Sequence, residues 1–315
     1  MAETIIATIS PMLVMFTCIL VGFILRKARV LPENAASVLS KLVLYVFLPA
    51  AMLASFIKYC TVASLMAEYK LILYCCVALA LEIVISIPLS KAFSKVKNER
   101  NIYIYALIFC NFGFLAKAIV PQIMGDEAFF RYNLFSAPIE LLMYTWAINL
   151  LIPEGKKPEK SGWKNLLNPI VVSIIAGIVL GLLGAKKWMP GFAMTALGNL
   201  GSCMGPVAML LTGVVIGGYS VRGLLKNKKV YIVTFLRLLV LPLILTGLLW
   251  LLGADKGTLL LALFGFGSAM GLNSVVIPAA YDGDTHTGAS MAMISHAGAV
   301  VSIPLLYALL NWILK

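Results

Sequence analysis

The sequence predicts an all-α protein that crosses a membrane many times. Of its 315 residues, 61% are hydrophobic and 12% are charged, and the mean hydropathy is +0.98. Soluble proteins carry about 25% charged residues, so this composition excludes an ordinary soluble domain. The hydrophobic residues gather in segments of about 20 residues, the length at which a helix crosses about 30 Å of hydrocarbon.

Ten such segments follow one another along the chain. They lie near residues 5–25, 35–57, 68–90, 101–123, 133–152, 167–186, 193–217, 229–251, 257–281 and 286–312. The first is expected to be a membrane span and not a cleaved signal peptide, because residues 1–4 carry an acid and no Lys or Arg, and the apolar run is too long. The most polar connection reads "PEGKKPEKSGWKN". We therefore expect a first unit at 1–152, a connecting loop at 153–166 and a second unit at 167–315.

Positive charge follows the connections between these segments. Most of the 25 Lys and Arg residues lie in the first, third, fifth and seventh connections. The positive-inside rule places these connections in the cytoplasm and both termini outside the cell. The net charge of +12 is thus explained by topology in a plasma membrane, and nucleic acid is not expected as a partner.

Similar motifs recur in the two halves of the chain. "LPAAMLASF" at 48–56 resembles "GPVAMLLTG" at 205–213, and their prolines are separated by as many residues as Pro121 and Pro278. The latter two follow polar, glycine-bearing interruptions in the fourth and ninth segments. This spacing predicts a duplicated five-helix unit whose second copy is inverted, because five is odd. Inverted repeats with interrupted helices are typical of secondary transporters with a site at the midplane, although Pro and Gly are also common in membrane helices.

A series of motifs in fixed order covers nearly the whole chain. They are "PMLVMFTCILVGFILRKARVLPENAASVLSKLVLYVFLPAAMLASF" (11–56), "NFGF" (111–114), "NPIVVSIIAGIVLGLLG" (168–184), "GPVAMLLTG", "RLLVLPLI" (237–244), "AMGLNSVVIPAAYDGD" (269–284) and "SIPLL" (302–306). In this order the chain resembles the auxin efflux carrier family of the bile acid/auxin transporter superfamily, in its short bacterial form.

The resemblance implies a fold and a function. The fold has ten transmembrane helices in a scaffold domain and a transport domain, with helices 4 and 9 broken and crossing at the substrate. The function is secondary active transport of a small organic anion such as malate, malonate or an auxin-like carboxylate, by alternating access. The chain departs from the family pattern at Lys117, at Met270-Gly271 and at Ser295-His296.

The interrupted segments supply the candidate binding residues. A broken helix leaves backbone groups unpaired, which protein, water or ligand must satisfy in a membrane, and half-helix N-termini hold carboxylates well. We expect residues of both interruptions to bind substrate, and others to mark the crossover; close helix packing is the alternative for small polar residues. The expected binding residues are Asn111, Gly113, Lys117, Gly271, Asn273 and Ser274, and the crossover residues are Pro121, Pro278 and Ser268.

Lys117 stands out because a lysine within a membrane span costs about 2.5–3.5 kcal/mol on insertion scales. Its expected role is a fixed cation for an anionic substrate, or a replacement for the charge of a coupling ion. The alternative is that its long side chain extends to the nearby outer interface.

Other ionisable residues within the segments are candidates for coupling. Glu82 and Glu140 are expected either to carry a proton or to pair with Lys117 or Arg237. His296 could titrate, or it packs with a hydrogen bond inside the protein. Arg237 is expected to anchor structure.

Several function classes remain to be weighed. The alternatives are a sodium-coupled symporter of bile-acid type and an anion channel. An enzyme is not expected, because His286 and His296 are the only histidines and the sequence shows no metal-ligand spacing or nucleophile with its base. We expect no cofactor, with coupling to H⁺ or Na⁺ left open. The expected partners are a small organic anion and the lipid bilayer, with a homodimer left open.

Overall fold

The computed structural model describes residues 2–156, 168–281 and 283–314. Within these ranges the chain forms helices joined by short turns, and no β-strand occurs. The prediction of an all-α protein with several membrane-crossing helices is confirmed. Most of the expected connecting loop at 153–166 lies outside the described residues, as does Asp282.

Six stretches in the described chain are long and apolar enough to cross a membrane. They are the part of α1 (Ala2–Lys27) from Ser10 to Lys27; α2, η1 and α3 (Ala35–Leu42, Val43–Phe47 and Leu48–Tyr59); α4 (Val62–Ser90); α10 and α11 (Gly191–Ser202 and Met204–Gly217); α13, η6 and α14 (Lys228–Phe235, Leu236–Val240 and Leu241–Leu251); and α17 (His286–Ile313). The η segments named here are single π-helical turns that continue the helices on either side.

The remaining helices are shorter. They are α5 (Lys97–Ile108), η2 (Phe112–Ala116), α6 (Lys117–Met124), α7 (Asp126–Leu142), η3 (Met143–Ala147), α8 (Ile148–Leu150), α9 (Pro169–Leu182), η5 (Ala185–Lys187), α12 (Val221–Leu224), α15 (Lys256–Gly267) and α16 (Asn273–Ala280). Each of the ten segments expected from the sequence overlaps at least one long or short helix of the structure.

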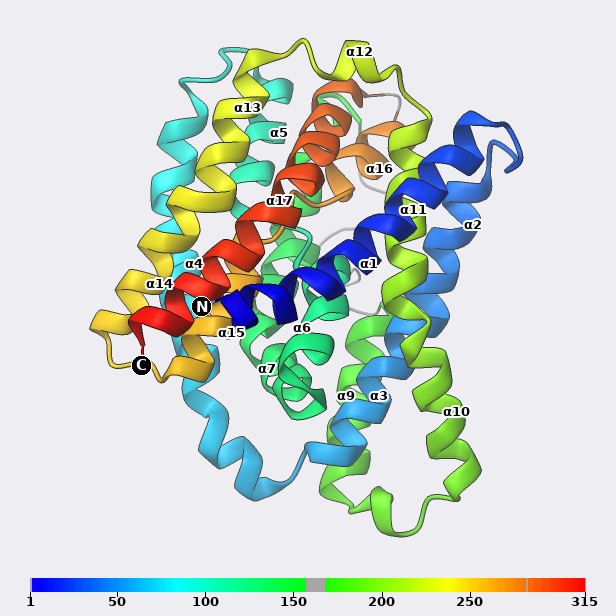
Figure 1. Cartoon of the computed structure of the whole chain (residues 1–315), viewed down its shortest axis with the longest axis vertical. Coiled ribbons are helices and arrows are strands. Elements are labelled where there is room, and N and C mark those ends of the chain that lie inside the picture. Colours follow the sequence, from blue (N-terminus) through cyan, green and yellow to red (C-terminus); the bar gives the residue numbers. More distant parts are fainter. Residues whose placement is uncertain (1, 157–167, 282, 315) are drawn as a thin grey trace.

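The closest packing divides the helices into two groups. In one group α1 packs along α11, and α3 packs against α9 and α10. In the other, α7 contacts α4, α6 and α15, while α17 contacts α13 and α15. Figure 1 shows α3, α9 and α10 on one side of the molecule and α4, α13 and α14 on the other. Contacts of α3 with α7 and of α1 with α6 and α17 join the groups.

Two helices are broken, and the breaks meet. The helix α5 ends at Ile108 and the chain coils again from Phe112, while α15 ends at Gly267 and α16 begins at Asn273. Cys110 and Met270 form an isolated antiparallel bridge, and the Asn111 N–H donates to the Ala269 carbonyl at 2.6 Å. The two breaks therefore satisfy some of each other's backbone groups, as an interruption remote from water requires.

Candidate functional site

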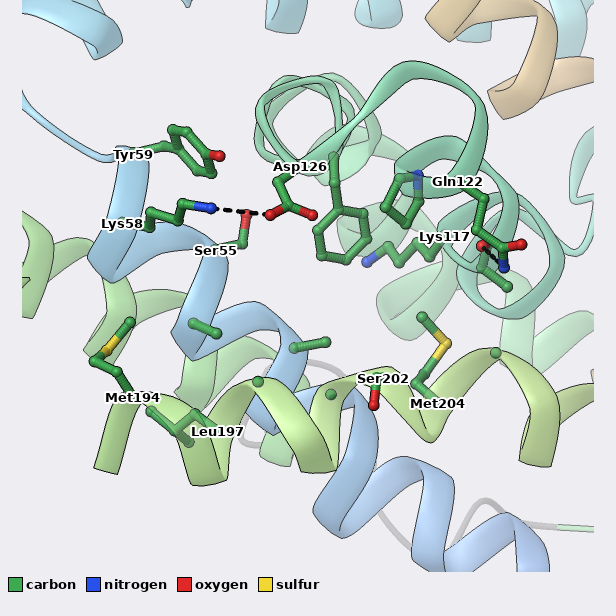
Figure 2. A pocket seen from close by; sticks show the side chains of 18 of the residues that line it. Ser55, Lys58, Tyr59, Lys117, Gln122, Asp126, Met194, Leu197, Ser202 and Met204 are labelled. Carbon is green, nitrogen blue, oxygen red and sulfur yellow. Dashed lines mark hydrogen bonds and ion pairs between the residues drawn. The ribbon is translucent and has the colours of Figure 1, made fainter. Parts of the chain in front are cut away.

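A cavity of about 540 Å³ lies where the two helix groups meet. Its walls come from α3, α6, the start of α7, α10 and α11. Figure 2 shows these walls, with Lys58 and Asp126 near one end and Lys117 further along. Most of the wall is apolar, and Ser55, Gln122 and Ser202 add uncharged polar groups.

The repeated motifs form two of these walls. Ala51, Ala54 and Ser55 belong to the motif at 48–56, and Gly205 and Pro206 begin the motif at 205–213. Close approach of the walls depends on missing side chains, as at Gly201, where a Cβ atom would lie 2.9 Å from the Cα of Ala51. In the sequence these motifs indicate duplication and a family resemblance, and their role in the cavity was missed.

Lys117 lies at the first position of α6, and the π-helical turn η2 separates it from the break. Only 1% of its side chain is exposed, and its ammonium group pairs with Glu140 of α7, whose side chain is 7% exposed. The Sδ atom of Met52 on α3 lies 4.0 Å from the ammonium nitrogen. Lys117 also lines the cavity. The side chain is thus held inside the protein by a buried carboxylate and does not extend to an interface.

A second ion pair stands at the rim of the cavity. Lys58 of α3 pairs with Asp126 of α7 at 2.9 Å, and their side chains are 41% and 66% exposed. The Lys58 ammonium also lies 4.9 Å from the ring centre of Tyr59, a cation–π geometry. This pair joins the two helix groups across the cavity. Sequence reasoning missed it because the two residues lie in different connections.

Asn111 and His296 meet at the crossing of the breaks. His296 Nδ1 lies 2.7 Å from the Ala292 carbonyl, which only accepts, so Nδ1 carries the proton. The Asn111 amide nitrogen then donates to His296 Nε2 at 3.1 Å, while its oxygen accepts from the Phe114 N–H at 3.3 Å. This arrangement fits a neutral imidazole. Both side chains are buried, and neither lines the cavity.

Arg237 supports the end of α5. Its guanidinium pairs with Glu82 of α4, and both side chains are fully buried. The same Nη1 atom donates to the Leu107 carbonyl at 2.8 Å, near the C-terminal end of α5, where a helix leaves carbonyls unpaired and carries negative partial charge. The guanidinium thus holds the helix end at the break through charge and hydrogen bonding.

The other predicted residues lie apart from the cavity. Ser268 and Ser274 donate to the backbone carbonyls of Phe264 and Gly271, at 2.7 and 2.8 Å. A Cβ at Gly271 would lie 3.2 Å from the Cys110 carbonyl, so glycine permits the bridge there. Three further positions complete the set: Gly113 has open space beside it, the Asn273 amide faces Met143 Sδ, and Pro278 is buried in α16.

Of the predicted site, the cavity contains only Lys117 and Pro121. Both prolines lie within the short helices α6 and α16 and not at the breaks themselves. Within the described residues, no group of three or more His, Cys, Asp or Glu side chains is placed to hold a metal ion.

The buried charges are balanced. The buried Lys, Arg, Asp and Glu side chains of the described chain are Lys117, Glu140, Arg237 and Glu82, and they form the two pairs given above. An unpaired buried charge is costly, whereas a pair with good hydrogen bonds is tolerated. A ligand that reaches Lys117 therefore meets an ammonium group already bound to a carboxylate.

Comparison with known proteins identifies the family. A family model described as membrane transport protein matches residues 7–307. An uncharacterized transporter of Methanocaldococcus jannaschii is 25% identical over 219 residues, which cover 67% of this chain and 69% of that protein. The resemblance seen in the motifs is thereby confirmed, and the chain belongs to the membrane transport protein family of auxin efflux carriers.

Proposed function

We propose that the protein is a secondary active carrier of small organic anions and that the cavity beside Lys117 is its substrate site. The observation that carries this proposal is a buried ammonium group in the wall of a largely apolar cavity, one π-helical turn after the break of a helix. A volume of about 540 Å³ lies within the range of roughly 300–1,000 Å³ typical of small-molecule sites. Malate, malonate and an aromatic carboxylate such as indole-3-acetate all suit a site with one charged end and apolar walls.

The position of the cavity supports alternating access. It lies between the helix group of α3, α10 and α11 and the group that contains α6 and α7. Movement of one group against the other would close one side of the cavity and open the opposite side, as in carriers built from two rigid parts. These two groups correspond to the proposed scaffold and transport domains.

Charge distribution orients the cavity. The rim residues Lys58 and Asp126 lie at connections that the positive-inside rule places outside the cell. This supports our proposal of an outward-facing state of a plasma-membrane carrier with both termini outside. Labelling an epitope at either terminus on intact cells tests this orientation, which cytoplasmic termini would contradict.

Arg237 favours a carrier without sodium over the sodium-coupled alternative. Its guanidinium already neutralises Glu82 and binds a carbonyl at the end of α5. These are the oxygen ligands that a sodium ion at this break would need. Sodium-dependent uptake would contradict this inference.

Transport in proteoliposomes tests the proposed function. Purified protein is reconstituted with internal malate, malonate or indole-3-acetate, and counterflow of the same radiolabelled anion is measured with and without sodium. We expect counterflow of at least one of these anions above protein-free vesicles. No movement of any of them would refute the proposal, and channel-sized currents in a planar bilayer would favour the anion channel.

A further inference from the structure

The buried pair Lys117–Glu140 restricts how an anion can bind. In the structure the pair carries no net charge and is almost wholly screened from solvent. The other buried cation, Arg237, is paired with Glu82, and the rim cation Lys58 is paired with Asp126. Within the described residues, the cavity therefore offers no ammonium group that lacks a carboxylate partner.

A substrate carboxylate that binds Lys117 would place two carboxylates beside one ammonium group. The site would then hold a net negative charge in a region from which water is largely excluded. Burying an uncompensated charge is strongly unfavourable, and two carboxylates that share a site cannot both remain ionised. One proton removes the excess charge that the carboxylate at Lys117 adds, and Glu140 is the protein carboxylate placed to accept it. The second carboxylate of malate or malonate would lie further along the cavity, toward the rim cation Lys58.

We propose that Glu140 is the proton site of the carrier and that a substrate anion and one proton bind together. The proposal rests on the proposed function. In the empty site, Glu140 is ionised and pairs with Lys117. In the loaded site, the substrate carboxylate takes over Lys117 and the proton resides on a Glu140 oxygen, released to the opposite solution when substrate leaves.

The other charged groups near Glu140 are paired elsewhere, so Lys117 is its ionic partner. The titratable groups that interact with Glu140 are Lys117 on α6, Tyr132 on α7 itself and Tyr144 on η3. Among the other charged groups of the packed helices, Arg131 on α7 pairs with Glu68 on α4. Glu82 pairs with Arg237, and Lys58 pairs with Asp126. Lys117 is the charged group in direct contact with Glu140.

Transport of the anion is coupled to the proton because a site that holds only one of the two is unfavourable. An empty site with protonated Glu140 leaves the Lys117 charge without a carboxylate, and a loaded site with ionised Glu140 carries excess negative charge. Both states bury an unbalanced charge. The protein therefore changes conformation either empty and unprotonated or with one anion and one proton.

Counting protons on binding tests the proposal without any variant. An anion that the wild type exchanges (malate, malonate or indole-3-acetate) is titrated calorimetrically into the purified full-length protein near pH 7.5, in two buffers with different heats of ionisation. We expect uptake of about one proton for each anion bound. Binding without proton uptake in the wild-type protein would overturn the proposal.

A pH gradient tests the same point in transport. With the potential clamped at zero, a gradient of one pH unit, acidic outside, corresponds to about tenfold accumulation for one coupled proton. We expect this accumulation of the exchanged anion in the wild type, relative to protein-free vesicles. We expect Glu140→Gln to lose the pH-driven accumulation, so that any counterflow it still performs is independent of the pH gradient. Glu127→Gln, which removes an exposed carboxylate from the same helix, is the matched control and should accumulate as the wild type does.

The outcomes separate this proposal from the function on which it rests. If the wild type exchanges none of malate, malonate and indole-3-acetate, the proposed function fails and this inference fails with it. If the wild type exchanges an anion but the pH gradient drives no accumulation, or if Glu140→Gln still accumulates it, only the inference fails. Should Glu140→Gln not fold, the wild-type proton count decides.

Discussion

Breaking the buried pair should destabilise the protein far more than breaking an exposed pair. The informative change is Lys117→Met, which keeps a long side chain near Met52 but leaves Glu140 without its cation. The exposed pair Lys97–Glu154, with side chains 59% and 63% exposed, supplies the control, Lys97→Met. The double variant Lys117→Met/Glu140→Gln removes both charges.

The expected magnitude follows from burial. Removing one partner of a buried ion pair costs about 3–5 kcal/mol. This loss of unfolding free energy has an upper limit, because neutralising an ordinary glutamate carboxyl at pH 7.5 costs about 4 kcal/mol. We therefore expect Lys117→Met to lose about 3–4 kcal/mol, the double variant less than about 1.5 kcal/mol, and Lys97→Met less than about 1 kcal/mol.

Unfolding in mixed micelles measures these differences. Because the double variant restores charge balance, it should recover most of the stability that Lys117→Met loses. Equal losses in Lys117→Met and Lys97→Met would refute the claim that burial makes this pair strong.

Three further predictions concern other parts of the molecule. Gly198→Phe should abolish counterflow without loss of stability, since Gly198 lines the cavity and a Cβ there meets nothing within 4 Å. The control is Gly247→Phe on α14, where a Cβ also meets nothing within 4 Å, and this variant should transport normally. Inhibition by both variants would contradict the location of the site. Tyr132→Phe should cost about 1 kcal/mol of unfolding free energy, because the buried hydroxyl donates to the Phe112 carbonyl at 3.1 Å; an unchanged value would show that this bond adds no stability. Although partial burial alone would raise the pKa of Asp255, hydrogen bonds from Thr258 and the charge of Arg131 bring it below its usual value. Asp255→Ala should therefore cost about 1 kcal/mol of unfolding free energy at pH 7. Since the lowered pKa favours folding above about pH 4, this loss should shrink as pH drops below that value. A loss that stays constant from pH 7 to pH 3 would contradict this.

The broken helices could be predicted from the sequence because their signals are local. Polar and glycine residues at 111–113 and 268–274 interrupt apolar segments, and the breaks occur at those places. Membrane helices can likewise be predicted from the hydropathy and length of a segment. Pro121 and Pro278 follow the interruptions in the sequence, and in the structure they lie inside the helices α6 and α16 that follow the breaks.

The partners of the buried ion pairs could not be predicted, because they depend on packing between helices that are distant in the sequence. Glu82 and Glu140 were both candidates for Lys117 and Arg237, and no spacing rule separates the choices. Packing of α4 against α7 and of α6 against α7 decides which carboxylate faces which cation. The cavity was missed for the same reason, since its walls come from α3, α10 and α11 as well as from the helix that carries Lys117.

The most direct test of the central claim is counterflow of malate, malonate and indole-3-acetate in proteoliposomes that contain either the wild type or Lys117→Met/Glu140→Gln. The double variant is chosen because its buried charge is balanced, so it should fold. We predict counterflow of at least one anion by the wild type and a loss of at least about tenfold in the variant, the equivalent of about 1.4 kcal/mol. Counterflow by the variant at the wild-type rate and affinity would contradict the assignment of Lys117 to the anion site.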